Sequence, residues 1–535
     1  MLSKLSEPRR LLSIIIVIAF LLRIPGIFWG LPIIDKYAHL YHPDEPKIIR
    51  GAMAFPEDIF ENEDLRYPTA LHYFVGTIVL PLDALTASSQ LSDSQFQNLT
   101  FIIARLISIA HGLGAVVLVY RFGNKYYNTN TGLLAAALLS VSLFHARHSA
   151  IATTDVATSF WIMVVLTLLY RFSSRSTYRD YIVLGALTGL LTGIKYSGAI
   201  VVVSIALILL KVLSEVEGRN QKQKSIIGGL ISATTAMFTF LITTPTILVN
   251  PKAFRESMNI LSIFVGGQRV PLWNIQPLSM DYNFLVDAIG APLAWLMLFG
   301  IVFAFRKSEW HISLPLVLMM VVYILYFWGS MIPRYYILIL PILCLLAARG
   351  AASLLNSHNL YFRGGMVTAL AVTIIYSLFY TIAGMVLMLN DTRSEASAYI
   401  QANIPAGATV GYWYIGSTFR GGWELPFVDP EIYRFADNLD SPEYVILTSQ
   451  KYLPFAQALS STYLSADYVW DPQFAFAWYM GRIPDPEVFE FYDYFLNGVG
   501  EKYHYELIEV FDPLNINIPI EFPPPGIRIY RRIDP

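Results

Sequence analysis

The stretch LLSIIIVIAFLLRIPGIFWGL (residues 11–31), followed shortly by YHPDEPK (residues 41–47), decides the class of fold. The first segment is long enough to cross a bilayer, follows a basic N-terminal flank and lacks a clear small-residue cleavage site, so we interpret it as a retained membrane span. The basic flank predicts a cytoplasmic N-terminus. Asp44 and Glu45 then follow the span, where burying carboxylates is costly, which indicates chemistry at the bilayer surface.

The composition supports a membrane protein. Of the residues, 55% are hydrophobic and 14% are charged, and the mean hydropathy is +0.50. The formal net charge is -2, and Lys and Arg are scattered between apolar runs, which argues against a nucleic-acid partner because phosphate backbones require a basic surface. Cys344 is the single cysteine of the chain, so no intramolecular disulfide forms.

The apolar runs predict an α-helical polytopic protein with about eleven transmembrane helices. The basic clusters between these runs all fall on one side, as the positive-inside rule requires, and both acids then face outward. This threading treats residues 67–85 as an interfacial or re-entrant segment, because Pro68, Pro81 and Asp83 interrupt it; counting it as a span would leave both termini on the same side. The predicted spans are residues 11–31, 101–120, 132–148, 156–170, 181–194, 197–210, 226–249, 284–305, 312–329, 333–348 and 366–389.

The composition changes after Asn390. The last part of the chain has roughly twice as many acidic as basic residues and no run long enough to span a membrane. We therefore predict a transmembrane domain over residues 1–389, with a first outer loop at about 32–100 that contains interfacial helices, and an extracytoplasmic soluble α/β domain over residues 390–535. In the latter domain we expect a helix at 392–403 and strands at 409–414, 444–448, 505–511 and 527–530.

Three acidic residues are candidates for catalysis. Asp44 and Glu45 lie between Pro43 and Pro46, which restrict the backbone, and a carboxylate fixed there could accept a proton from an attacking hydroxyl. Two solvated loop acids are the plain alternative. Asp155 lies at a predicted outer turn, where it could equally cap the following helix. Two histidines near the first acids make a metal site conceivable, but no further ligand signature accompanies them, and no metal is predicted.

Several cations stand at the predicted membrane surface or inside spans. Lys195 and Arg334 occupy outward turns, where they suit a phosphate; interfacial anchoring is the alternative for each. Arg23 lies inside the first span, where it either snorkels outward or contacts an anion. Arg105 lies in the second predicted span with the same ambiguity.

A set of short motifs is distributed along the first 390 residues. Its members are Arg23, Asp44-Glu45 with Lys47, Arg66-Tyr67-Pro68 leading to Leu71, His72 and Tyr73, Ala104-Arg105-Leu106, the 132–136 span that ends in Asp155, Lys195-Tyr196, and Arg334-Tyr335. Together these features resemble the polytopic glycosyltransferases of the GT-C class, specifically the family 39 and protein O-mannosyltransferase-like group, which uses polyprenyl-phosphate sugars. The resemblance covers the layout of roughly the first 390 residues. It departs from the group at Lys47, where related sequences often have Arg, and at Arg66-Tyr67-Pro68, where they often have a basic residue followed by two prolines.

The resemblance implies that Asp44 is the general base toward the acceptor and that Asp155 is a second acid near the site. It implies that Lys47, Arg66, Lys195 and Arg334 surround the lipid phosphate of the donor. Glu45 is expected either to take part in catalysis or only to orient the loop or the acceptor.

The predicted function is transfer of a sugar, with inversion, from a polyprenyl-phosphate-linked donor to an acceptor hydroxyl on the extracytoplasmic side. The expected partners are the lipid-linked donor, a hydroxyl acceptor on protein, lipid or glycan, and membrane lipids. A divalent metal is possible but not required, because cations can stabilise the departing phosphate. The competing function is a membrane transporter or lipid flippase, which the outward position of the charges and the lack of an internal repeat disfavour.

Overall fold

The computed structural model of the chain consists of two compact units. The helical unit comprises Met1–Phe28, Asp44–Met385 and Ile518–Glu521, and the sheet unit comprises Trp29–Pro43, Val386–Asn517 and Phe522–Pro535. The structure describes residues 7–31, 41–42, 44–57, 60, 65–86, 92–173, 175–266, 271, 273–274, 276–303, 309–328, 332–412, 432, 434–436, 442–448, 504–516, 518 and 526–533.

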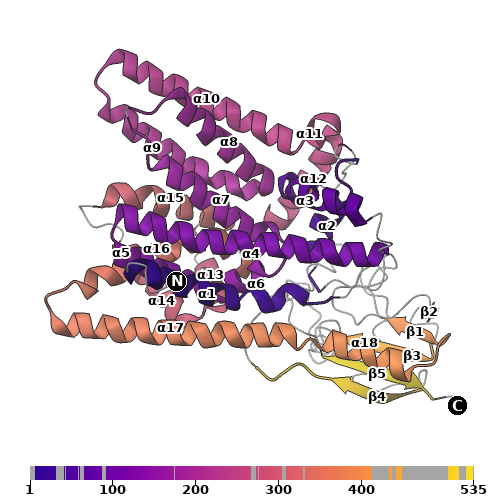
Figure 1. Ribbon diagram of the computed structural model, residues 1–535. Helices are drawn as coiled ribbons and strands as arrows, with labels where there is room; N and C mark the ends of the chain where they lie inside the picture. The colour runs from indigo at the N-terminus through magenta and orange to yellow at the C-terminus, as the bar shows by residue number, and fades with distance from the viewer. Residues whose placement is uncertain are drawn as a thin grey trace. The chain divides into compact units, whose positions relative to one another are not determined.

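The helical unit is built from α-helices joined by short 3-10 turns (Figure 1). Its elements are α1 (Glu7–Leu21), η2 (Ile24–Phe28), α2 (Glu45–Met53), α3 (Ala70–Thr86), α4 (Asp93–Tyr126), α5 (Thr129–Ser140), α6 (Leu143–Ser149), α7 (Thr154–Leu169), α8 (Tyr178–Ile194), η3 (Tyr196–Val201), α9 (Val202–Glu215), α10 (Arg219–Thr243), α11 (Thr246–Val249), α12 (Pro251–Gly266), α13 (Gln276–Ile289), α14 (Ala291–Phe303), α15 (Trp310–Tyr326), η4 (Pro333–Leu338), α16 (Leu340–Leu355) and α17 (Leu360–Leu389).

The long apolar helices identify an integral membrane protein. Within the described residues, five helical segments are long and apolar enough to cross a membrane. A sixth is formed if α5 and α6, which are bent by 66° against each other, count as one broken span. The five segments are Glu7–Phe28, Gln95–Tyr126, Tyr196–Glu215, Arg219–Thr243 and Leu360–Asn403. The other predicted spans coincide with shorter or interrupted helices, so the total of eleven and the orientation of the termini stay predictions.

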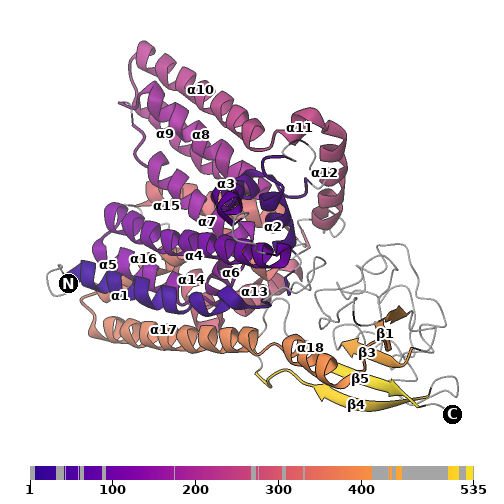
Figure 2. The same cartoon turned by 45° about the vertical axis from the view of Figure 1, so that its right-hand side comes forward.

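Glycines bring α8 and α10 into close contact along their length. The two helices lie side by side in both views (Figures 1 and 2). Gly185, Gly189 and Gly193 recur every fourth residue, so they share one face of α8. A side chain on Gly185 would meet the backbone carbonyl of Ser232, and one on Gly189 would meet that of Ala236. The absence of side chains therefore allows the two backbones to pack directly, as in other membrane helix pairs.

Arg23 joins the first helix to the break between α5 and α6. Its guanidinium is fully buried and donates to Ser149 Oγ at 3.2 Å and to the carbonyls of Ala19 and Ser140. A second nitrogen lies 2.9 Å from His145 Nδ1. Among the residues that the structure describes, Arg23 thus neither snorkels outward nor reaches an anion. Its hydrogen bond to the Ser140 carbonyl, near the α5–α6 bend, stabilises the fold because a buried carbonyl needs a donor.

The sheet unit contains a five-stranded mixed sheet in the order β2-β1-β3-β5-β4, with α18 against it (Figure 2). Its elements are α18 (Thr392–Asn403), β1 (Thr409–Tyr412), β2 (Arg434–Ala436), β3 (Tyr444–Thr448), β4 (Tyr505–Phe511) and β5 (Ile527–Arg532). β1 pairs in parallel with β2 and β3, whereas β5 runs antiparallel to β3 and β4. The predicted helix and the strands at 444–448, 505–511 and 527–530 are confirmed; residues 413–414 of the first predicted strand lie outside the described residues.

The hydrophobic core of the sheet unit follows directly from its residue spacing. Ala396 and Ile400 are four residues apart and both are fully buried, so they mark the inner face of α18. Ile527 and Ile529 alternate with more exposed residues along β5, as expected for a half-buried strand. One helix thus packs on one sheet, while the extracytoplasmic soluble domain over residues 390–535 stays a prediction.

A buried charge cluster ties the N-terminal part of the sheet unit to the start of α18. Arg393 is fully buried, binds the carboxylate of Asp391 through two nitrogens and lies 3.9 Å above the ring of Tyr41. Trp29 donates its indole N–H to the same carboxylate at 3.1 Å. The segment that precedes the Asp44–Glu45 pair is thereby anchored to residues more than 350 positions away.

Candidate active site

Asp44 and Arg334 form one half of the candidate site. Asp44 is the N-cap residue of α2, but its side chain accepts no capping hydrogen bond. Its Oδ2 instead lies 2.6 Å from Nη1 of Arg334, which enters from the first turn of η4. Both side chains retain some exposure, 13% for Asp44 and 18% for Arg334, so the pair stays accessible to a ligand.

Asp155 and Lys195 form the other half. Asp155 lies in the first turn of α7, whose N-cap is Thr153, so capping does not explain the acidic residue here. The Asp155 carboxylate accepts a short hydrogen bond from the Lys195 ammonium. Lys195 occupies the extended break between α8 and η3, as expected for a cation at a turn.

Tyr67 and Tyr335 join the two halves. The ring of Tyr335 lies 5.7 Å from the Lys195 ammonium and 6.0 Å from the Arg334 guanidinium. Burial is the main reason why the pKa of Tyr67 is raised well above its usual value of 10.0, and the Asp44 carboxylate raises it further while Arg334 opposes the shift. Asp155 acts on the same hydroxyl in the same direction. Both acids thus lie near one phenol, which stays protonated at neutral pH.

Lys47 lies beside Tyr67, with its ammonium 5.0 Å above the ring. Tyr196, which directly follows Lys195, donates its hydroxyl to the carbonyl of Leu65 at 2.8 Å and so holds the turn that carries Arg66 and Tyr67. Of the residues predicted around a donor phosphate, Lys47 and Arg334 thus lie near Tyr67, Lys195 lies near Tyr335, and Arg66 belongs to the adjoining turn.

Glu45 is bound differently from its neighbour Asp44. Its carboxylate is fully buried and accepts two hydrogen bonds from Arg105, at 2.9 and 2.8 Å. The backbone N–H of Ala152, shortly before Asp155, donates to the same carboxylate at 2.8 Å. Arg105 also donates to the carbonyl of Ile27. This environment favours the orienting role for Glu45, because the charge is neutralised and its oxygens are occupied.

His42 is buried, whereas His39 lies outside the described residues. Within the residues that the structure describes, no group of three or more His, Cys, Asp or Glu side chains could hold a metal ion.

Two features of the site are not predicted from the sequence. The sequence indicates Tyr67 only as part of the Arg66-Tyr67-Pro68 triplet, although an aromatic residue beside a cation in a loop is a usable signal. The partner of Arg105 could not be named, because an ion pair across 60 residues depends on how α2 packs against α4. The intramembrane position of Arg105 is the only signal that it has an acidic partner.

The comparisons with known proteins concern the family and the fold of the chain. Residues 94–242 match the model of the family described as dolichyl-phosphate-mannose-protein mannosyltransferase. This range contains Arg105, Asp155 and Lys195. A search of curated protein sequences finds no match.

Solved structures show the same fold over nearly the whole chain. An archaeal oligosaccharyltransferase from Archaeoglobus fulgidus, in its apo form, superposes with a TM-score of 0.56 at 12% identity, covering 99% of this chain and 89% of the other. The oligosaccharyltransferase AglB from the same organism, in complex with an inhibitory peptide and a dolichol-phosphate, gives a TM-score of 0.53 at 13% identity, with coverage of 98% of this chain and 88% of the other. These findings confirm the resemblance to the polytopic GT-C glycosyltransferases.

Proposed function

We propose that the protein is a membrane glycosyltransferase of the family 39 type, which transfers a sugar from a polyprenyl-phosphate-linked donor to an acceptor hydroxyl on the extracytoplasmic side. The observation that supports this most strongly is the convergence of two acid–cation pairs, Asp44–Arg334 and Asp155–Lys195, around Tyr67. A phosphate ester needs cations for its charge, and an attacking hydroxyl needs a base. The matched family and the dolichol-phosphate bound to AglB favour such a donor.

In the proposed reaction, the acceptor oxygen attacks the anomeric carbon from the face opposite to the phosphate. The bond between that carbon and the phosphate oxygen breaks, and its electron pair remains on the departing polyprenyl phosphate. The acceptor proton passes to the carboxylate of Asp44. Displacement from the opposite face inverts the anomeric centre.

The cations have a second role in this proposal. Arg334 and Lys195 each face a carboxylate that keeps them in place before the donor arrives. The phosphodiester of the donor presents two anionic oxygens that compete with the carboxylates for both cations, and its charge grows as the sugar departs. When Arg334 turns toward the phosphate, its interaction with Asp44 weakens, and the affinity of Asp44 for a proton rises. Donor binding thus converts Asp44 from a salt-bridged anion into a stronger base.

Lys47, Arg66 and Tyr67 complete the donor site in this proposal. The Tyr67 hydroxyl remains a hydrogen-bond donor at neutral pH, because its pKa lies well above the usual value. The acceptor is a hydroxyl of a protein, lipid or glycan. Mannose is the first sugar to test, because the matched family transfers it to protein.

The test is transfer by the purified full-length protein, reconstituted with polyprenyl-phosphate mannose and Ser- or Thr-containing peptides. We expect release of free polyprenyl phosphate together with a glycosylated acceptor, both measured by mass spectrometry. Asp44→Asn should abolish transfer while it retains donor binding and the wild-type melting temperature, since the amide cannot accept the proton.

Glu57→Gln is the matched control, because Glu57 is an exposed acid of the same outer loop. It should retain full transfer. Near-normal turnover by Asp44→Asn would remove Asp44 from the mechanism. Movement of the intact donor across the bilayer without release of lipid phosphate would instead support the flippase alternative.

A further inference from the structure

A cavity lies between α4 and α7 at the ends remote from the candidate active site. Its volume is about 250 Å³, equivalent to about eight water molecules at ~30 Å³ each. Arg105 lies within α4 and Asp155 lies in the first turn of α7, and both helices continue from these residues to the cavity. Arg121 and Arg171 each follow by sixteen positions, which corresponds to roughly 24 Å along a helix, and Lys125 lies one turn further. The cavity is therefore a separate location.

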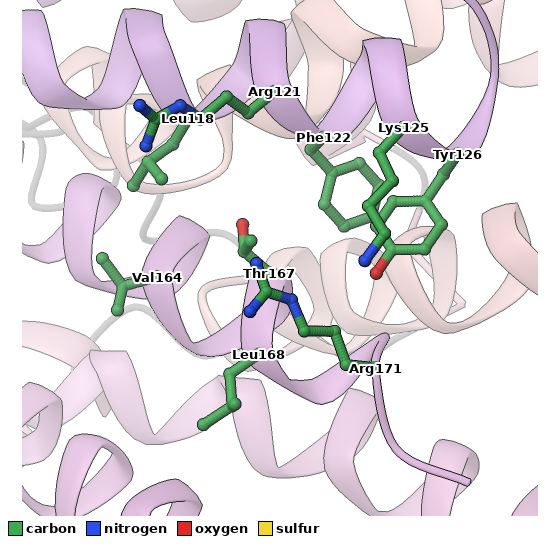
Figure 3. A pocket seen from close by; sticks show the side chains of 9 residues that line it. All are labelled: Leu118, Arg121, Phe122, Lys125, Tyr126, Val164, Thr167, Leu168 and Arg171. Carbon is green, nitrogen blue, oxygen red and sulfur yellow. The ribbon is translucent and has the colours of Figure 1, made fainter.

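Three cations from the two helices surround this cavity (Figure 3). Arg121 and Lys125 are four residues apart and share one face of α4, whereas Arg171 follows the end of α7. In Figure 3, the Lys125 ammonium and the Arg171 guanidinium point into the same space. Within the described part of the chain, none of the three forms an ion pair with a carboxylate.

The remaining lining combines apolar surface with a buried polar atom. Leu118, Val164 and Leu168 supply aliphatic walls. The hydroxyl of Tyr126 is buried and has no hydrogen-bond partner among the residues that the structure describes. Its ring is held by Phe122, with ring centres 4.7 Å apart, and by Tyr170, at 5.4 Å. A buried hydroxyl without a partner is costly, so a ligand that accepts its hydrogen bond would be stabilising.

We propose that this cavity binds the phosphate headgroup of an anionic phospholipid. Helix dipoles and the positive-inside rule explain why a cation lies at the end of each helix. They do not explain why three cations and an unsatisfied hydroxyl line the same cavity. A phosphodiester supplies the missing negative charge and the hydrogen-bond acceptor, and the aliphatic walls suit the start of an acyl chain. Basic pockets between transmembrane helices bind such headgroups in other membrane proteins.

The test is lipid retention by the full-length protein, measured by native mass spectrometry after addition of phosphatidylglycerol or, separately, phosphatidylcholine with the same acyl chains. The wild type should retain more phosphatidylglycerol than phosphatidylcholine. The double variant Arg121→Gln/Arg171→Gln should bind it roughly thirtyfold more weakly, because two phosphate contacts are lost. Tyr126→Phe should weaken retention by a smaller factor, since only the hydroxyl is removed.

Arg179→Gln/Arg363→Gln is the matched control, because both arginines are exposed and neither lines the cavity. Equal phosphatidylglycerol retention by the two double variants would overturn the proposal. A third arm uses inorganic phosphate alone: binding as tight as that of the lipid would overturn the lipid assignment. Asp44→Asn should retain the lipid fully, so this test is independent of the proposed transferase activity.

Discussion

Adjacent acidic residues in this protein have different environments. Asp44 is partly exposed and faces one cation, whereas Glu45 is fully buried beneath three hydrogen-bond donors. Two consecutive residues at a helix start point in different directions, so one reaches the site and the other reaches the interior. This separation allows one carboxylate to remain available for chemistry while the other holds the surrounding elements.

We expect Glu45→Gln to destabilise the protein by about 3–5 kcal/mol, because Arg105 would keep a buried charge without a counter-ion. Thermal unfolding of the purified protein measures this loss, with Glu57→Gln as the exposed control. If Glu45 only orients the site, the double variant Glu45→Gln/Arg105→Gln should recover part of the stability. An unchanged melting temperature for Glu45→Gln would contradict the buried ion pair.

The buried carboxylate of Asp281 predicts how the stability of the protein depends on pH. Asp281 is 7% exposed and precedes the apolar helix α14; burial raises its pKa from 3.8 to about 6. The folded state therefore binds this proton more tightly than the unfolded state does. The resulting stabilisation is fully present below pH 3.8 and is lost as the pH rises through 6, by about 1.4 kcal/mol for each pH unit between these values.

Asp281→Asn should remove this pH dependence, because an amide does not titrate. The melting temperature of the variant should exceed that of the wild type at pH 8 and by a smaller margin at pH 5. Exposed Asp512, in the sheet unit, provides a control substitution to Asn. A constant difference between variant and wild type at both pH values would show that Asp281 does not titrate in this range.

At the scale of helices and strands, the residue patterns predict where the helices lie better than they predict how long each helix is. Each predicted span overlaps a helix, since apolar runs and glycine or proline breaks are local features. The bend between α5 and α6 and the left-handed Gly290 between α13 and α14 shorten helices that the apolar pattern joins. Bends of this kind depend on partners elsewhere in the fold, such as Arg23, which local patterns do not contain.

The contact between α8 and α10 is sensitive to added volume. Gly189→Ala should destabilise the protein by about 1–3 kcal/mol, because the new Cβ would meet the backbone carbonyl of Ala236. Gly229→Ala is the control within α10, since its Cβ would meet only Leu209 at 3.8 Å. That change should be neutral or stabilising, because alanine favours the helix. Equal melting temperatures for both variants would contradict the close backbone contact.

At the scale of the whole molecule, residues far apart in sequence build both the site and the sheet unit. The sequence predicts which acids and cations face outward, because the charge pattern between spans is regular. It does not predict the pairing of Asp44 with Arg334, which are 290 positions apart, or the central place of Tyr67. Such pairings depend on how several helices pack, which no short window of sequence contains.

The sheet unit offers a test of its long-range anchor. Arg393→Lys should destabilise this unit by about 2 kcal/mol, because lysine loses the two-nitrogen contact with Asp391 and stacks less well on Tyr41. Limited proteolysis should then cleave the unit faster. Arg531→Lys is the control, since its ion pair with Glu506 is exposed and contributes little. Equal cleavage rates would contradict the anchoring role of Arg393.

The distance in sequence between Asp44 and Arg334 also has a consequence for biosynthesis. At ~5–20 residues per second, the ribosome needs roughly 15–60 s to add the 290 residues that separate them. Throughout this time the emerging chain contains the acid but lacks its cation. The nascent protein is therefore unable to form the Asp44–Arg334 pair on any shorter fragment, and the proposed transferase activity would begin only when synthesis has passed η4.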